Sequence, residues 1–340
     1  MVDLIIHPGH PKCGSTSIQK FLLRNRHKLE EKGVFLPDDN FCFSFNKNYR
    51  RSVETPRKFF KQILDTENSN QFAGSLSRFK DRVQKLNMLA KEAGCNKIIV
   101  SAENLVNKLS SVASSEIHNI FRKEFNDKRV VYFVRRQDDF ILSAWQQWEH
   151  KRGRKLKKYV QYCKRNKIPN YLKAVRFFEK AYGKNALRVI PLHKKCLINA
   201  NLFEEFLFQA EIPSEGMNSE EIVANEALNP YLCDILSSMP KVYKDVHDVA
   251  IKESLFRITQ GASILSNKGK NYLNSNARKE IMSLFRDDNL ILHKEYCHRD
   301  YDFESVWGDQ VLGNKKLLSE NEQLKRLLRV FVKAALRGNV

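Results

Sequence analysis

The stretch LIIHPGHPKCGSTS, residues 4–17, decides the fold of this chain. Its first three residues are apolar and predict a short strand that is buried on both faces. The middle of the stretch is a loop with two glycines, and the end is a run of three hydroxyl residues. Apolar residues then recur at helical spacing up to Gly33, so we expect a helix over 15–32. The stretch therefore predicts a strand, a loop and a helix at the start of the chain.

Three more apolar runs predict buried strands of a parallel sheet, at 98–100, 130–134 and 187–190. Helices are predicted between them, over 56–66, 75–93, 138–150 and 170–182. Strands that alternate with helices are typical of an α/β fold with a central parallel sheet flanked by helices.

The domain layout follows from length and periodicity. The 340 residues are enough for one large domain, which we expect over 1–310, with the core sheet within 1–195 and a helical cover over 196–310. The segment 311–340 is expected to form a basic amphipathic C-terminal helix. Three roles stay open for that helix: packing on its own domain, forming a homodimer, or contact with an anionic membrane surface.

Composition limits the class of protein. Lys and Arg outnumber Asp and Glu by 59 to 39, so the net charge of +20 favours anionic partners such as nucleotides, acidic glycans or lipid headgroups. Seven cysteines occur without a CxxC pair, which argues against a zinc site or a disulfide framework. No apolar stretch is long enough to span a bilayer or to act as a signal peptide, and we expect a cytoplasmic protein, with attachment to the inner membrane surface left open.

The loop between the first strand and the first helix is suited to an anion. Backbone N–H groups and the positive end of the helix dipole converge at such a loop. Gly14 allows close approach of a phosphate, the hydroxyls of 15–17 donate hydrogen bonds, and Lys12 adds a positive charge. Gly9 and Gly14 have the spacing of a Walker A loop, but Ser15 stands where that motif requires Lys.

A second anion site is predicted where the strand over 130–134 ends. Arg135 follows that strand, so it should emerge on the same rim of the sheet as the Lys12 loop. A guanidinium can bind a phosphate with two hydrogen bonds, and the hydroxyl of Ser143 on the next helix could complete the pocket. For Arg136 two roles stay open, contact with a ligand or pairing with Asp138 or Asp139.

These motifs resemble those of sulfotransferases that use 3′-phosphoadenosine 5′-phosphosulfate (PAPS). The sequence Pro-Lys-x-Gly-Ser-Thr at 11–16 resembles the family's 5′-phosphosulfate loop, and the Arg-x7-Ser spacing of Arg135 and Ser143 resembles its 3′-phosphate motif. The longer frame over 7–19 is similar to the bacterial, carbohydrate-type branch. Cys13 departs from the family's usual Ser or Thr, and the residues after Arg135 depart from its usual Asn or Asn-Pro.

The resemblance implies a P-loop-containing nucleotide-binding fold, PAPS as donor, 3′-phosphoadenosine 5′-phosphate (PAP) as product, and no metal. It also implies which residues bind the donor. The expected contacts are Lys12, Cys13, Gly14, Ser15, Thr16, Ser17, Arg135 and Ser143, with Lys268 and Lys270 as weaker candidates from a basic loop.

The candidate general base is Glu103, in the sequence Ser-x-Glu-Asn after the strand at 98–100. Many cytosolic members of the family carry a catalytic His after the corresponding strand, and the Ser-x-Glu-Asn form resembles a bacterial counterpart. Glu103 could instead cap the following turn or pair with Lys108. His7 and His10 are the alternative bases, although His7 could simply brace the loop.

We therefore expect a sulfotransferase that moves a sulfuryl group from PAPS to a hydroxyl or amine of an acceptor by in-line displacement. The basic run over 151–158 favours a carbohydrate or glycolipid acceptor that could itself be acidic. The alternative is a P-loop kinase that acts on a small molecule or sugar. Nucleic acid is the least favoured partner, because the basic residues are spread along the chain and no standard binding motif occurs.

Overall fold

A computed structural model describes residues 1–37, 57–220, 227–266, 269–309 and 320–336. The chain divides into two compact units. The first contains Met1–Arg135, Asn170–Ala224 and Asp288–Val306, and the second contains Arg136–Pro169, Asn225–Asp287 and Trp307–Val340.

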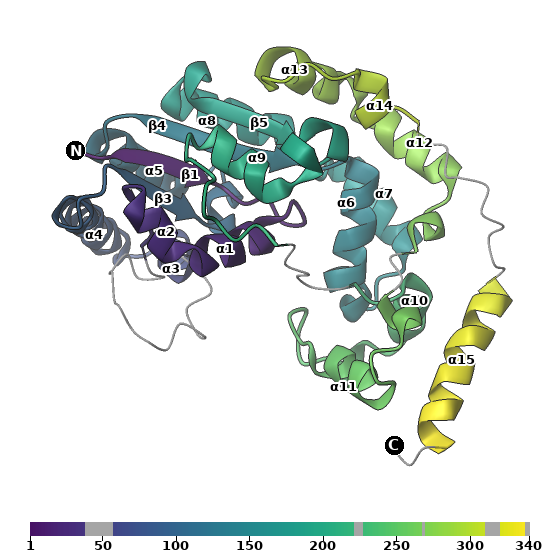
Figure 1. Cartoon of the computed structure of the whole chain (residues 1–340). Helices are drawn as coiled ribbons and strands as arrows, with labels where there is room; N and C mark the ends of the chain where they lie inside the picture. Colours follow the sequence, from purple (N-terminus) through teal and green to yellow (C-terminus); the bar gives the residue numbers. More distant parts are fainter. Residues whose placement is uncertain (38–56, 221–226, 267–268, 310–319, 337–340) are drawn as a thin grey trace. The chain divides into compact units, whose positions relative to one another are not determined.

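The first unit is built on a parallel sheet of five strands in the order β2-β3-β1-β4-β5, with helices on both faces (Figure 1). The strands are β1 (Asp3–His7), β2 (Val34–Phe35), β3 (Lys97–Ser101), β4 (Lys128–Val134) and β5 (Leu187–Pro191). The α/β class is therefore confirmed, as are the four predicted strands. The sequence analysis missed β2, because a strand of two residues leaves no periodic pattern.

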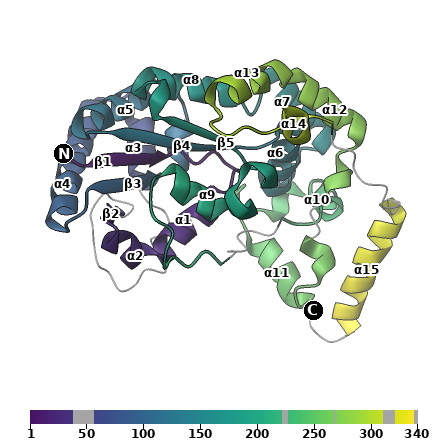
Figure 2. The same cartoon turned by 45° about the horizontal axis from the view of Figure 1, so that its top comes forward.

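The connections between strands explain the two helical layers. The chain runs from β1 to β2 in one direction along the sheet and from β3 to β4 in the other, so right-handed crossovers put the connecting helices on opposite faces. Figures 1 and 2 show α1 and α9 on one side and α5 and α8 on the other. The helices of this unit are α1 (Ser15–Arg24), α2 (Arg26–Glu31), α3 (Arg57–Thr66), α4 (Phe72–Glu92), α5 (Val112–Glu124), α8 (Tyr171–Tyr182), α9 (Leu202–Gln209) and most of α13 (Arg286–Tyr296).

The helix predicted over 15–32 is two helices, because the chain bends at Asn25. Asn25 has a φ of −99° and a ψ of 16°, outside helical values, and separates α1 from α2. Its side-chain amide donates to the carbonyl of Phe21 at 3.0 Å and to that of Asn218 at 3.0 Å. Asparagine side chains compete with the backbone for such hydrogen bonds, which explains the break.

The second unit is helical and packs around Trp145. Its helices are α6 (Gln137–Ala144), α7 (Leu156–Asn166), α10 (Pro230–Leu236), α11 (Ala250–Ile258), α12 (Ser275–Leu284) and α15 (Glu320–Leu336). The Trp145 indole is fully buried, donates to the carbonyl of Arg154 at 2.7 Å and stacks on Tyr272 at 5.6 Å. α6 continues into a π-helical turn over Trp145–Glu149, so only the first half of the helix predicted over 138–150 is α-helical. α14 (Phe303–Trp307) ends at the boundary between the two units.

Short 3₁₀ helices complete both units. They are η1 (Glu103–Val106), η3 (His150–Arg152), η4 (Lys184–Ala186), η5 (Lys194–Cys196), η6 (Ile198–Ala200), η7 (Pro240–Val242), η8 (Ser263–Ser266) and η9 (Lys270–Tyr272).

The expected layout, with a single domain over 1–310, stays a prediction. Residues 136–169 group with 225–287, whereas 288–306 return to the first unit. Helical periodicity shows that a helix buries one face and says nothing about which distant helix covers that face. Within the described ranges, no helix is both long enough and apolar enough to cross a membrane.

Candidate functional site

The candidate site lies at the carboxyl ends of three adjacent strands, β3, β1 and β4. His7 at the end of β1 is level with Ser101 at the end of β3. Ile6 is level with Val130, so β4 continues to Val134, three residues past the level of His7. That extension amounts to about 10 Å of strand, which runs alongside the loop that leaves β1. Open α/β sheets bind ligands beyond the carboxyl ends of their strands, at the point where the strand order reverses its direction along the sheet.

The loop from β1 to α1 is a tight turn with two special backbone positions. Lys12 has a φ of 65° and Gly14 a φ of 84°, both in the left-handed region that L side chains rarely adopt. A Cβ atom at Gly14 would also lie 2.8 Å from Leu202 of α9, and one at Gly9 would lie 2.6 Å from the Cβ of Ser15. These two glycines are therefore required for the backbone path.

The loop leads directly into the N-terminus of α1. Gly14 precedes the helix, and the first hydrogen bond of the helix runs from the N–H of Ile18 to the carbonyl of Gly14 at 3.0 Å. The N–H groups of the first turn, at 15–17, precede that bond and have no acceptor within the helix, as in every α-helix. Together with the helix dipole they favour an anion.

Arg135 lies against this loop. Its Nη1 donates to the carbonyl oxygen of Lys12 at 3.1 Å, and its side chain is half-buried. The extension of β4 past β1 brings the guanidinium to this point. The structure thus brings together two cationic residues that are 123 positions apart in the sequence, as predicted from the strand order of an α/β sheet.

Glu103 begins η1, directly after β3, and its carboxylate faces the loop. Ser15 Oγ donates to Glu103 Oε1 at 2.5 Å. Lys108, which was considered as a partner for Glu103, instead donates to the carbonyl of Leu64 at 3.1 Å and lies 3.9 Å from Asp65. The half-buried carboxylate and the two cationic residues therefore lie on the same rim, around the N-terminus of α1.

Cys13 lies beneath the loop rather than on its open side. It is 1% exposed, and its Sγ lies 3.7 Å from Tyr171 Oη. Burial raises the pKa of this thiol to about 12, so the group is a neutral thiol at physiological pH. Its N–H donates to the carbonyl of His10 at 3.1 Å. The geometry favours the interpretation of Cys13 as a packed residue of the loop, and not as a nucleophile.

The two histidines of the loop are held neutral. His7 is 1% exposed and its Nδ1 is 2.7 Å from Ser101 Oγ. Burial lowers the pKa of His7 to about 3 and that of His10 to about 4. The contact between His7 and Ser101 joins β1 to β3, so the bracing role that was considered for His7 fits its position, whereas a base must reach a substrate proton.

Arg136 is part of a buried ion cluster in the second unit. It donates to both carboxylate oxygens of Asp138, at 3.2 and 3.0 Å, and to the carbonyl of Gly308 at 2.8 Å. Arg278 donates to Asp138 at 2.9 Å and to Asp139 at 3.0 Å. Asp138 is fully buried and the two arginines are 6% and 4% exposed. Of the two roles left open for Arg136, the geometry favours the pairing with Asp138.

Three further predicted donor contacts belong to the second unit or lie outside the described residues. Ser143 is half-buried on α6. Lys268 lies outside the described residues, and for Lys270 the backbone at the start of η9 is described but the side chain is not. A joint site of Arg135 and Ser143 therefore stays a prediction from the sequence.

The basic run over 151–158 is partly neutralised by contacts within the second unit. Lys151 donates to the carbonyls of Val246 and Asp248, at 3.0 and 2.6 Å, and burial lowers its pKa. Arg154 and Lys155 form ion pairs with Glu149 at 2.7 Å and with Asp234 at 3.1 Å. The run is therefore a weaker candidate for binding an acidic acceptor than its sequence suggests.

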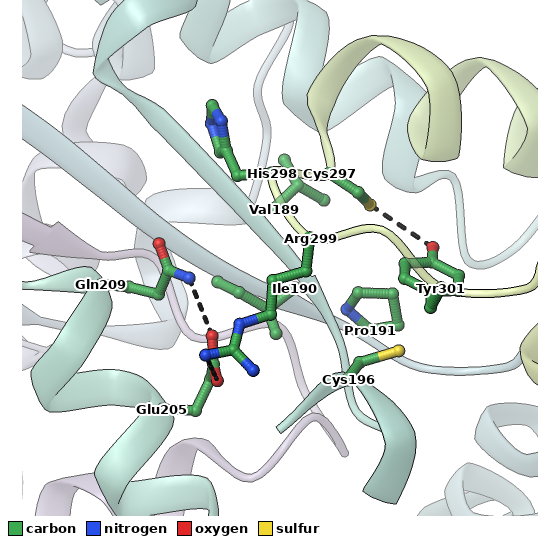
Figure 3. Close-up of a pocket in the computed structure, with 10 residues that line it drawn as sticks. All are labelled: Val189, Ile190, Pro191, Cys196, Glu205, Gln209, Cys297, His298, Arg299 and Tyr301. Atoms are coloured by element: carbon green, nitrogen blue, oxygen red, sulfur yellow. Dashed lines mark hydrogen bonds and ion pairs between the residues drawn. The ribbon is translucent and has the colours of Figure 1, made fainter. Parts of the chain in front are cut away.

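Two cavities of the first unit lie away from the loop. One is a small crevice beside β5, where Glu205 accepts from Gln209 at 2.8 Å and pairs with Arg299 at 3.7 Å, and Tyr301 contacts Cys297 at 3.5 Å (Figure 3). The pair of Arg299 and Glu205 joins the returning segment 288–306 to α9. The other, of about 430 Å³, lies at the amino ends of the strands. Parallel sheets of this kind bind substrates at the opposite end, where the carboxyl ends of the strands lie.

The sequence analysis missed the residues that support the loop from below. Tyr171 of α8 contacts Cys13, and Gln19 of α1 donates to the carbonyl of Ser101 at 3.2 Å. Their sequence separations from these partners are 158 and 82 residues, so no local pattern indicates the contacts.

Among the described side chains, no group of three or more His, Cys, Asp or Glu residues is arranged to hold a metal ion. The six described cysteines are all free thiols. Comparison with known proteins found no family model and no curated protein that matches this chain.

Proposed function

We propose that this chain is a sulfotransferase that transfers a sulfuryl group from PAPS to a hydroxyl or amine of a carbohydrate or glycolipid acceptor. The observation that carries the proposal is the contact between Arg135 and the carbonyl of Lys12 at 3.1 Å. It brings a second cation to the edge of an anion-binding loop. A donor nucleotide with phosphates at both its 5′ and 3′ positions requires two such cationic positions.

In the proposed reaction, the loop of residues 12–17 binds the 5′-phosphosulfate and Arg135 binds the 3′-phosphate. The acceptor oxygen attacks sulfur in line, and a new oxygen–sulfur bond forms while the bond between sulfur and the bridging phosphate oxygen breaks. The electron pair of the broken bond leaves with PAP. Lys12 and the first-turn N–H groups of α1 stabilise the charge that develops on that oxygen.

Glu103 would take the proton from the attacking acceptor. Its carboxylate lies on the same rim as the loop and is 2.5 Å from Ser15 Oγ, at the N-terminus of α1. A carboxylate at that position faces the group that is transferred, where a general base must act. Movement of Ser15 Oγ to a sulfate or phosphate oxygen would release Glu103 for the acceptor.

The main alternative function is that of a P-loop kinase. Kinases of that class need a Lys after the second glycine of the loop to bind the β- and γ-phosphates, and Ser15 occupies that position. They also use Mg²⁺, whereas sulfuryl transfer from PAPS involves less negative charge at the transferred group and can proceed on lysine and backbone dipoles.

Thermal unfolding separates these functions. PAP without Mg²⁺, at about a hundred times its dissociation constant, should raise the melting temperature by about 3 to 5 °C. Mg-ATP at the same concentration should raise it much less. An equal response to PAP and Mg-ATP would contradict the proposal, and a response to Mg-ATP alone would favour the kinase.

A further inference from the structure

The C-terminal helix α15 exposes an apolar strip on its outer side. Leu328 is 62% exposed and Val332 is 48% exposed. Residues four apart lie one above the other on a helix, so these two side chains form one strip along it. Exposed aliphatic side chains that cluster in this way mark interaction surfaces more often than single exposed ones.

The same helix is fixed to its own unit by a different side. Leu327 is 3% exposed and belongs to the hydrophobic core of the second unit, and Phe331 packs against that core. α15 contacts α10 and η8 of the same unit. The buried side of α15 is thus covered by packing within its own unit, and among the described residues of that unit the side chains of Leu328 and Val332 stay exposed.

A row of basic residues runs next to the strip. Lys325, Arg329 and Lys333 are all exposed and follow one another at intervals of four residues. Arg326 adds a fourth exposed cation, and no Asp or Glu occurs between Gln323 and Leu336. At 100° per residue, the mean direction of the basic row lies about 80° around the helix from that of the apolar strip. The outer side of α15 therefore combines aliphatic and cationic side chains.

We propose that the strip of Leu328 and Val332, with the row of Lys325, Arg329 and Lys333, binds the surface of an anionic phospholipid membrane. Aliphatic side chains next to a basic row enter the boundary between headgroups and acyl chains while the cations contact lipid phosphates. A second copy of the chain would bring the same positive row against this one, which opposes dimerisation through this side. A nucleic acid would satisfy the cations but not the aliphatic strip.

The binding should be peripheral and reversible. Two aliphatic side chains bury little area, and each basic residue near an anionic surface contributes about fivefold to the partition coefficient. The electrostatic part is screened within about 10 Å at moderate salt. This inference rests on α15 alone and stands whether or not the chain is a sulfotransferase.

Sedimentation of the full chain with vesicles tests the proposal. The vesicles are an equimolar mixture of phosphatidylglycerol and phosphatidylcholine, or phosphatidylcholine alone. The test variants are Lys325→Glu with Arg329→Glu, and Leu328→Ser with Val332→Ser. The matched controls change exposed residues of α4. Lys80→Glu with Lys85→Glu changes the charge by the same amount as the charge-reversal variant, and Met88→Ser replaces an exposed apolar side chain with serine. None of these positions supports the core.

We expect the wild-type chain and both controls to sediment with the anionic vesicles only. The charge-reversal variant should bind at least tenfold less, and the serine variant severalfold less. Equal binding to phosphatidylcholine alone, or full binding by the charge-reversal variant, would overturn the proposal. Two other results would also overturn it: unchanged binding by the serine variant, which would indicate a general polyanion site, and a wild-type dimer that the serine variant dissociates.

Discussion

Individual side chains around the β1–α1 loop have separate tasks that follow from their burial. Lys12 and Arg135 are half-buried and cationic at the rim, and Glu103 is the carboxylate that accepts from Ser15 of the same loop. Cys13 and His7 are enclosed beneath the loop. Residues that shape the loop should therefore affect stability, and residues on the rim should affect turnover.

Glu103→Gln tests the assignment of the base. The amide keeps the shape of the carboxylate and can still contact Ser15, but it cannot take a proton, so we expect kcat to fall by about 10² to 10⁴. Binding of PAP, measured by calorimetry, should change little. The control is Ser15→Ala, which removes the 2.5 Å partner and keeps the carboxylate. Wild-type turnover in Glu103→Gln would show that another group is the base.

Cys13→Ser tests whether the thiol takes part in the chemistry. A neutral thiol under the loop, with a pKa of about 12, contributes packing but no thiolate. Turnover should therefore stay within about threefold of wild type, and the free energy of unfolding should change by about 1 kcal/mol or less. Native protein should also leave Cys13 unlabelled by iodoacetamide in a peptide map. Rapid labelling of Cys13 with loss of activity would contradict this assignment.

Elements differ in how far the sequence predicts them. Strands β1, β3, β4 and β5 were found because each is a compact run of β-branched and other apolar residues. The helices α5 and α7 were not predicted individually, and the break at Asn25 was not foreseen. The ion cluster at the start of α6 was not predicted either. Asp138 and Arg278 lie 140 residues apart in the sequence, so only the folded chain reveals their pairing.

Asp138→Asn tests that cluster and the role of Arg136 together. The substitution leaves two buried guanidiniums, those of Arg136 and Arg278, without their shared carboxylate. Breaking a buried ion pair in this way should destabilise the protein by about 3 to 5 kcal/mol, measured by urea denaturation. The affinity for PAP should be unchanged at a temperature where the variant is folded. A stable variant with weakened PAP binding would indicate instead that Arg136 serves the ligand.

The site was predicted in outline by the same strand logic. The carboxyl ends of adjacent parallel strands meet at one rim, which is why Lys12, Glu103 and Arg135 could be grouped without any contact information. The extension of β4 past β1, the contact between Tyr171 and Cys13 and the neutral state of His7 depend on register and burial. Those properties are set by tertiary packing, which a single sequence does not show.

Several histidines in both units of the chain are buried without charge. Burial lowers the pKa of His7 to about 3 and the pKa values of His118 and His150 to about 4, from an ordinary 6.5. The unfolded chain therefore binds more protons than the folded chain below about pH 6.5. Stability should be complete above that pH and should fall as the pH drops towards 4.

The predicted slope is about 1.4 kcal/mol per pH unit for each of these histidines between about pH 6 and 4. Urea denaturation at a series of pH values measures it. His118→Gln should lower the total slope by one such increment, since His118 lies against Tyr182 at 2.6 Å in the interior. His27→Gln, at an exposed position, is the control substitution. A slope that is insensitive to His118→Gln would contradict the buried, neutral state.

We propose that the Lys12 loop and Arg135 bind the two phosphates of one adenosine nucleotide. Calorimetric titration of PAP and AMP, which differ only in the 3′-phosphate, tests it in wild type, Arg135→Ala and Lys12→Ala. We expect wild type to prefer PAP by about tenfold to a hundredfold, Arg135→Ala to bind both nucleotides alike, and Lys12→Ala to weaken both while it keeps the preference. Arg135→Ala with the wild-type preference for PAP would contradict the claim.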